Sequence, residues 1–334
     1  MASPPPKRQR TDEGIEEVLC LHTTRSSFFE VDIDVQDEPI TRSSIWYDDG
    51  SVVLQAEHHQ FRVHWSVLTH HSSFFRDMRG LPQPPDQPSV DGCPIVELQD
   101  VVADVEHLLK ALYNPTFLLQ KALPLPVLSA LIRLCKKYDF RDMLESTVDR
   151  LTFENPTTLD AFDALTPDGA QYKTTRILHY PGVMYDMLTV ARENNIQSAL
   201  PCAYFRAVLY GNKRLFDGVG QGVYLTPVDQ RRCILGREAL LRVQAQDGYT
   251  FGWLHSADGN CTDPARCNTV TINILRKTSL DLYVLSRPSG GHSGRCPSCH
   301  QHRQDSWNAG RKRIWEELPS FFELRPWSEL TNDL

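Results

Sequence analysis

Four cysteines near the C-terminus have the residue type and the spacing that metal coordination requires. Cys261 and Cys267 are separated by five residues, and the run Cys296-Pro-Ser-Cys299 begins 29 positions after Cys267. A Cys-x2-Cys turn allows both thiolates to reach one tetrahedral ion, and structural zinc usually takes four nitrogen or sulfur ligands. The pattern therefore predicts one structural zinc ion, held by these four cysteines, that joins two helices of a small C-terminal unit.

Other interpretations of the cysteines stay open at this point. The gap between Cys261 and Cys267 is wider than the two to four residues that are usual in zinc sites. Free thiols are one alternative, and a redox Cys-x2-Cys pair is another, although no βαβ pattern surrounds it. A catalytic zinc is disfavoured because four cysteine ligands leave no open coordination position. Four histidines lie near enough in sequence to substitute for a ligand: His255, His292, His300 and His302.

A basic segment surrounds the second cysteine pair. Over residues 287–315 the only acid is Asp305. The cations are Arg287, Arg295, Arg303, Arg311, Lys312 and Arg313. Such a patch with the aromatic Trp307 near a zinc site allows a nucleic-acid interface. We favour a solvated helix face instead, with the cations facing water and a buried apolar stripe. That stripe consists of Trp307, Ile314, Trp315 and Leu318.

Several classes of protein are disfavoured by what the sequence lacks. It contains no Walker loop, no glycine-rich dinucleotide fingerprint, no His-Glu-x-x-His and no Gly-x-Ser-x-Gly. Its apolar runs are too short to span a bilayer, and its first ten residues lack the apolar core of a signal peptide. The net charge of −7 argues against nucleic-acid or membrane binding by the chain as a whole. We expect a non-enzymatic protein of the nucleus or cytoplasm.

The N-terminal tail combines a short basic run with a long acidic one. Lys7, Arg8 and Arg10 lie within ten residues that contain no acid, whereas residues 11–49 carry eleven acids against two arginines. An acidic stretch with so few apolar residues cannot bury enough surface to fold, so residues 1–42 are predicted to be disordered. The three cations suit an importin-type groove and form a candidate nuclear-import motif, and a merely solubilising tail is the alternative.

From Ser43 onward the pattern is that of a folded domain with the order strand, strand, helix, strand, and then helix after helix. Short β-branched or alternating runs predict three strands, the first two as a hairpin, at residues 51–56, 61–64 and 95–98. Apolar residues at helical spacing predict three helices, at residues 101–113, 128–138 and 143–151. Five prolines between positions 80 and 94 predict an exposed loop.

Five motifs in this order resemble those of the BTB/POZ domain over residues 43–152. They are Phe61–Leu68, Ser72–Met78, Val96–Asp100, Val105–Tyr113 and Leu131–Phe140. The signature and core positions that the resemblance marks are Asp49, Phe61, His64, Leu68, Phe75, Leu109, Tyr113 and Tyr138. It implies an α+β BTB/POZ domain of short strands and helices that forms a homodimer and binds other proteins.

The same resemblance implies that Asp49 and His64 form a hydrogen-bonded polar pair beneath the hairpin. A catalytic Asp–His dyad is the alternative, and it is disfavoured because no motif places a serine or cysteine nucleophile beside it. The segment Trp46–Gly50 and the C-terminal half further resemble a large group of fungal, basidiomycete-type BTB proteins.

Residues 153–255 are predicted to be a helical extension, in the position that a BACK-type region takes after a BTB domain. Thr226 and Pro227 mark one helix start in it, as N-cap and first helical residue. Residues 256–334 are predicted to be a helical C-terminal unit that carries the cysteine cluster. The fold class is thus a BTB/POZ domain followed by a mainly helical C-terminal region.

Together these features predict an interaction protein. Its BTB domain dimerises and binds partners as an adaptor, with a cullin-type ubiquitin ligase scaffold as one candidate partner. The alternative is a nuclear, zinc-stabilised transcription regulator that binds nucleic acid through the basic C-terminal patch. We expect no membrane partner, and we consider nucleic acid the less favoured partner.

Overall fold

The computed structural model describes residues 39–82, 86–166, 172–220, 222–255, 259–278, 282–287 and 294–334. The chain divides into two compact units between Pro39 and Ile40, and all described helices and strands belong to the second unit. Lys7, Arg8 and Arg10 lie outside the described residues, as does nearly all of the segment predicted to be disordered.

The first part of the second unit is a small sheet with helices. The strands are β1 (Thr41–Trp46), β2 (Val52–Ala56), β3 (His59–Val63), β4 (Ser89–Val90) and β5 (Cys93–Leu98). The helices that follow or interrupt them are α1 (Trp65–His71), α2 (Ser73–Gly80), α3 (Val102–Tyr113), α4 (Leu125–Lys137) and α5 (Arg141–Glu154). This succession confirms the predicted order of strands and helices, because apolar periodicity depends on local geometry alone.

The sheet has the strand order β1-β3-β2-β5-β4. β2 and β3 form the predicted antiparallel hairpin, with Leu54 opposite Phe61, and β5 joins β2 in parallel. β1 begins at Thr41, two residues before the predicted start of the folded domain, because Thr41 and Arg42 pair with β3. The proline-rich segment is also not wholly a loop, since Ser89 and Val90 pair with β5 as the short strand β4.

The second part of the unit is helical, as predicted. Its α-helices are α6 (Leu159–Ala164), α7 (Val183–Glu193), α8 (Leu200–Val208), α9 (Asn212–Asp217), α10 (Pro227–Val243), α11 (Pro264–Thr278) and α12 (Pro297–Phe321), with 3-10 turns η1 (Gln197–Ala199), η2 (Gly252–Leu254) and η3 (Trp327–Glu329). Thr226 caps α10, as predicted, by accepting a hydrogen bond from the Asp229 amide. None of the helices in the described ranges is long and apolar enough to cross a membrane.

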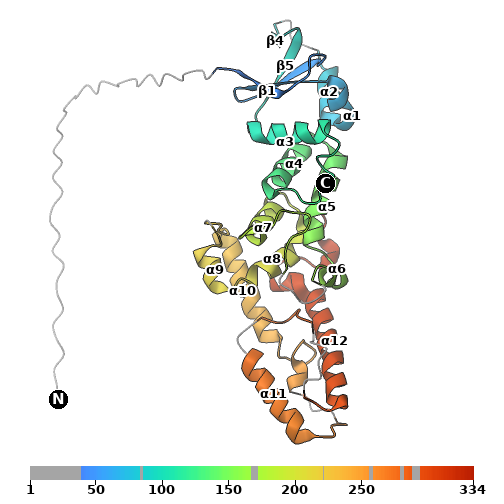
Figure 1. Ribbon diagram of the computed structural model, residues 1–334, viewed down its shortest axis with the longest axis vertical. Helices are drawn as coiled ribbons and strands as arrows, with labels where there is room; N and C mark the ends of the chain where they lie inside the picture. The colour runs from blue at the N-terminus through green and yellow to red at the C-terminus, as the bar shows by residue number, and fades with distance from the viewer. Residues whose placement is uncertain are drawn as a thin grey trace, which may run out of the picture. The chain divides into compact units, whose positions relative to one another are not determined.

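One hydrophobic core runs through both parts. Most buried apolar residues from Val52 in β2 to Phe322 after α12 belong to one cluster, and smaller clusters form around Trp253 and around the cysteines. The Trp315 indole in α12 donates to the Thr157 carbonyl, 2.9 Å away, and packs against Phe162 of α6. The C-terminal residues then return towards α5 (Figure 1), where Asn332 forms a bridge with Ile196. The boundaries predicted after residues 152 and 255 remain predictions, since the described residues from Ile40 to Leu334 form one compact unit.

Candidate metal centre

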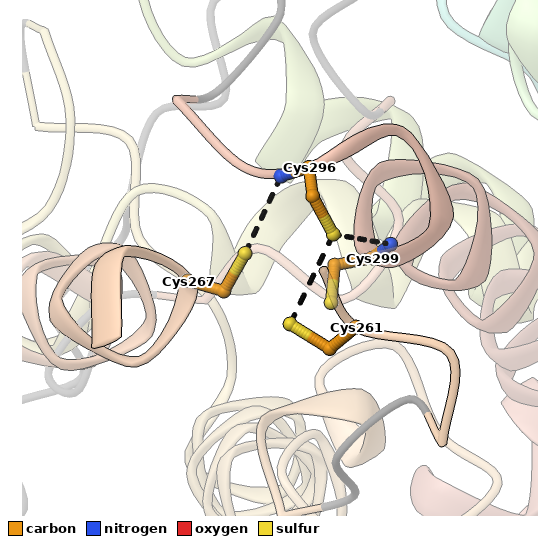
Figure 2. A group of neighbouring side chains, drawn as sticks. All are labelled: Cys261, Cys267, Cys296 and Cys299. Carbon is orange, nitrogen blue, oxygen red and sulfur yellow. Dashed lines mark hydrogen bonds between the residues drawn. The ribbon is translucent and has the colours of Figure 1, made fainter. Parts of the chain in front are cut away.

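Three neighbouring segments bring the four C-terminal cysteines together. Cys261 lies in the loop before α11, Cys267 lies in the first turn of α11, and Cys296 and Cys299 lie at the start of α12. Figure 2 shows the four side chains pointing towards one another from these segments. The four sulfur atoms all lie within 4.8 Å of one another. Cysteines up to 38 positions apart in the sequence therefore form one cluster.

The start of α12 fixes the second pair of cysteines. Cys296 is the N-cap residue, and its sulfur accepts a hydrogen bond from the Cys299 amide at 3.5 Å. Pro297 occupies the first turn, where its missing N–H costs nothing. The Cys296 amide in turn donates to the Cys267 sulfur at 3.3 Å. These bonds place the sulfur of Cys267 on α11 next to Cys296 at the start of α12.

The spacing of the sulfur atoms fits a tetrahedral ion. Zn–S bonds of about 2.3 Å require sulfur atoms about 3.8 Å apart. The sulfur atoms of Cys261 and Cys296 are 3.9 Å apart. Since no pair exceeds 4.8 Å, side-chain shifts of an ångström or less would complete the tetrahedron. The cluster is thus close enough to bind one metal ion through four ligands.

The environment of the cluster shields most of its thiols from water and shifts the pKa values of two of them in opposite directions. Cys267, Cys296 and Cys299 are buried, and Cys261 is half-buried. The hydrogen bond from the Cys299 amide lowers the pKa of the Cys296 thiol. Burial and the neighbouring sulfur atoms raise the pKa of Cys299. A cation is therefore needed if all four sulfurs are to be thiolates, the form that binds metal.

The other described cysteines differ from the cluster. Cys135, Cys202 and Cys233 lie on helices, as expected, and burial raises the pKa of each thiol. Cys93 is buried in β5 and donates to the Gly50 carbonyl at 3.1 Å. Cys20 lies outside the described residues. Within the described ranges, the metal-competent group contains the four cysteines and none of the candidate histidines, of which His292 lies outside those ranges.

The solvated helix face that the sequence suggested is confirmed only in part. Its apolar stripe is buried, and Lys312 and Arg313 are exposed, but two of the cations are not. Arg303 and Arg311 are only 4% and 5% exposed. Arg311 forms an ion pair with Asp163, and Arg287 lies 3.5 Å from the same carboxylate. Arg313 pairs with Glu317 at 3.0 Å. Because Asp163 comes from α6, far away in sequence, a helical wheel of α12 alone does not reveal these contacts.

Two arginines flank the cysteine cluster and share one aromatic partner. The Arg295 guanidinium lies 4.4 Å from the Trp253 ring centroid, and the Arg303 guanidinium lies 5.8 Å from the same ring and 5.0 Å from Trp307. The positions of both arginines in the sequence indicate that they lie near the cysteines. Arg295 directly precedes Cys296, and Arg303 follows Cys299 by four positions, on the same helix face.

The BTB signature residues form a core and one surface cluster. The buried members are Phe61, Leu68, Phe75, Leu109 and Tyr138, each at most 3% exposed. Asp49 and His64 do pair, at 3.1 Å between Oδ1 and Nε2, but the Asp49 side chain is 85% exposed. The pair therefore lies at the surface and not beneath the hairpin, because Asp49 belongs to the turn after β1.

Tyr113 links this pair to helix α3. Its hydroxyl accepts from the His64 amide at 2.8 Å and lies 3.2 Å from Nδ1 of the same residue. The hydrogen bond from His64 lowers the pKa of Asp49, and burial raises the pKa of Tyr113 to about 12. The contacts between His64 and Tyr113 thus join the hairpin to α3, and their role is structural.

Comparison with known families identifies the first part of the chain. Residues 49–152 match the family model of the BTB/POZ domain. The match starts within the turn that contains Asp49 and includes all eight signature positions. The chain therefore contains a BTB/POZ domain, which is a protein–protein interaction module in general, followed by a mainly helical C-terminal region. No curated protein matches the chain.

Proposed function

We propose that this protein is a non-enzymatic adaptor whose BTB domain forms a homodimer and binds further proteins. The BTB/POZ match over residues 49–152 is the observation that carries this proposal. A cullin-type ubiquitin ligase scaffold is the candidate partner, and membership of the fungal group of BTB proteins is part of the same proposal.

The edge of the sheet supports self-association. β1 is an edge strand, paired with β3 on one side only, and its first three residues are half-buried or exposed. Ile40, directly before it, is 57% exposed. An edge strand with an exposed apolar residue can pair with a second chain, and dimer interfaces of this kind bury apolar surface.

Light scattering on the full-length chain at micromolar concentration tests the dimer. We expect twice the chain mass for the wild type and a shift towards monomer for Ile40→Asp. Leu209→Asp is the matched control, since Leu209 is similarly exposed, at 52% against 57% for Ile40, but lies after α8. A wild-type protein that is monomeric throughout would refute the homodimer.

Pull-down with a purified cullin tests the candidate partner. A dimer that retains no cullin would refute the cullin partner and leave the homodimer standing.

Localisation in the nucleus is a separate part of the proposal. Lys7, Arg8 and Arg10 are clustered cations in the tail, and a basic run of this kind suits import receptors. Deleting residues 1–12 from a fluorescent fusion should shift the protein towards the cytoplasm. Unchanged localisation would remove the nuclear assignment.

We propose one structural zinc ion per chain as the cofactor of the C-terminal region. Four cysteine ligands close the coordination sphere, so the ion stabilises the fold and performs no catalysis. Metal analysis of protein purified without chelator should give about one zinc per chain. The alternative, a zinc-stabilised regulator that binds nucleic acid, has less support, because Arg303 and Arg311 are buried and Arg287 and Arg313 face carboxylates.

A further inference from the structure

The cysteine cluster lies beside two positive charges that have no carboxylate partner. Neither Arg295 nor Arg303 is within ion-pair distance of an acidic side chain in the described part of the chain, whereas Arg287, Arg311 and Arg313 all are. The Nε atoms of Arg295 and Arg303 are buried and donate no hydrogen bond to any described residue. Burying a charge without a counter-charge is costly, so this arrangement requires an explanation.

Aromatic stacking offsets only part of this cost. Both guanidinium groups lie against Trp253, and Arg303 also lies against Trp307. A cation–π contact contributes about 0.5–2 kcal/mol, which is less than the several kcal/mol that burying an ion costs. The two cations also repel each other, since the neighbouring Arg295 adds to burial in lowering the pKa of Arg303. Aromatic rings alone therefore do not account for the pair.

Thiolates at the cysteine cluster would supply the missing negative charge. Arg295 lines the same cavity as Cys261, Cys267 and Cys299, so its charge lies next to the sulfur atoms. Four thiolates around a divalent ion carry a net charge of −2, because four negative charges meet two positive ones. Four neutral thiols carry none. Two arginines balance the first state and leave the second with two uncompensated cations.

We infer that Arg295 and Arg303 are the counter-charges of a doubly negative zinc tetrathiolate at Cys261, Cys267, Cys296 and Cys299. Arg295 acts directly, because it adjoins Cys296 and its Nη2 atom is held by a 2.6 Å hydrogen bond to Thr271 on α11. Arg303 lies one helical turn after Cys299 and shares the Trp253 ring with Arg295. The inference rests on the proposed zinc ion and assigns two positioning residues that set how tightly this ion is bound.

Zinc affinity in the full-length chain tests the inference, measured by competition with a chromophoric chelator. Arg295→Gln removes the charge and should weaken zinc binding about 10- to 100-fold, as loss of outer-sphere partners commonly does. Arg303→Gln should weaken it less. Lys312→Gln is the matched control, because it removes one exposed cation from the same helix and should leave affinity unchanged.

The charge-preserving variant separates electrostatics from packing. Arg295→Lys loses the planar stack on Trp253 but keeps the charge, so it should bind zinc nearly as tightly as the wild type. If Arg295→Lys is as weak as Arg295→Gln, or if Arg295→Gln equals the wild type, the counter-charge role is refuted. The cobalt–thiolate absorption band of each Co²⁺-loaded variant shows that the site itself is intact. A wild-type chain that binds no zinc would instead refute the proposed cofactor, which distinguishes the two failures.

Discussion

At the scale of single residues, the cysteine cluster was predictable from the sequence and its surroundings were not. Metal-ligand spacing depends only on which sulfur atoms can reach one point, so Cys296-x2-Cys299 already indicated a ligand pair. The burial of Arg303 depends on Trp253 and Trp307, and the position of Trp253 beside α12 is a tertiary contact that no local pattern encodes. Asp49 shows the reverse case, since its partner His64 was expected but its exposure was not.

The substitution Cys299→Ser tests the metal centre at this scale. We expect it to abolish zinc binding, because a serine hydroxyl is a poor substitute for a thiolate ligand. Zinc binding contributes about 10–16 kcal/mol in zinc-finger peptides, comparable with the whole stability of a domain. Residues 259–278 and 294–303 should therefore lose their protection from hydrogen exchange. From Trp315 onward α12 should stay ordered, because Trp315 packs on Phe162 and donates to Thr157.

The matched control for this substitution is Cys93→Ser. Cys93 donates to the Gly50 carbonyl, and a serine hydroxyl can keep that bond. This variant should retain one zinc ion and an unchanged exchange pattern in the C-terminal region. Full zinc content in Cys299→Ser would show that the four sulfurs are not the ligand set.

At the scale of elements, close backbone contact determines how α12 meets the segment before it. Gly310 lies in the middle of α12, and a Cβ atom there would come within 3.0 Å of the backbone of Tyr249 and Thr250. The neighbouring Thr250 side chain is held by a 2.6 Å hydrogen bond to the Val284 carbonyl. Since these obstacles are backbone atoms, they cannot rotate away. Glycine at this position is thus a packing requirement.

We therefore predict that Gly310→Ala destabilises the protein. Alanine in a helix interior is favoured over glycine by about 1 kcal/mol, which acts in the stabilising direction. Overpacking against rigid atoms costs about 1–3 kcal/mol, so the net effect should be a lower midpoint of urea unfolding. Gly80→Ala at the end of α2 is the control, because a Cβ atom there meets nothing within 4 Å. Equal midpoints for the two variants would contradict the proposed close contact.

The predicted and the observed elements differ in a way that shows which elements a sequence can predict. α3, α4 and α5 follow their apolar stripes to within a few residues at each end, since the stripe reports the face that a helix buries. β4 was not predicted, because a two-residue strand has no periodicity and exists only through its pairing with β5. Tertiary contacts, not local pattern, decide such short elements.

At the scale of the whole molecule, buried and half-buried tyrosines occur in both parts of one core. Tyr113 and Tyr138 belong to the BTB domain, whereas Tyr180, Tyr185 and Tyr204 belong to the helical region. Burial raises the pKa of all five phenols. Tyr204 also donates to the buried carboxylate of Asp229 at 2.6 Å, so its ionisation would place two negative charges side by side.

These shifts predict loss of stability at alkaline pH. A phenol whose pKa is higher in the folded than in the unfolded chain stabilises the fold while it is protonated in both states. For Tyr113 the pKa rises from 10.0 to about 12, so its contribution is complete below pH 10 and falls away as the pH rises towards 12. Because similar shifts occur in both parts, unfolding should be cooperative and should release several protons at once. Spectroscopic titration of tyrosinate, followed together with circular dichroism, should show a fraction of the eleven tyrosines ionising only as the helical signal is lost. Ionisation of all eleven near pH 10 with the helices intact would show that these phenols are open to water and that the shared core is looser than the structure indicates.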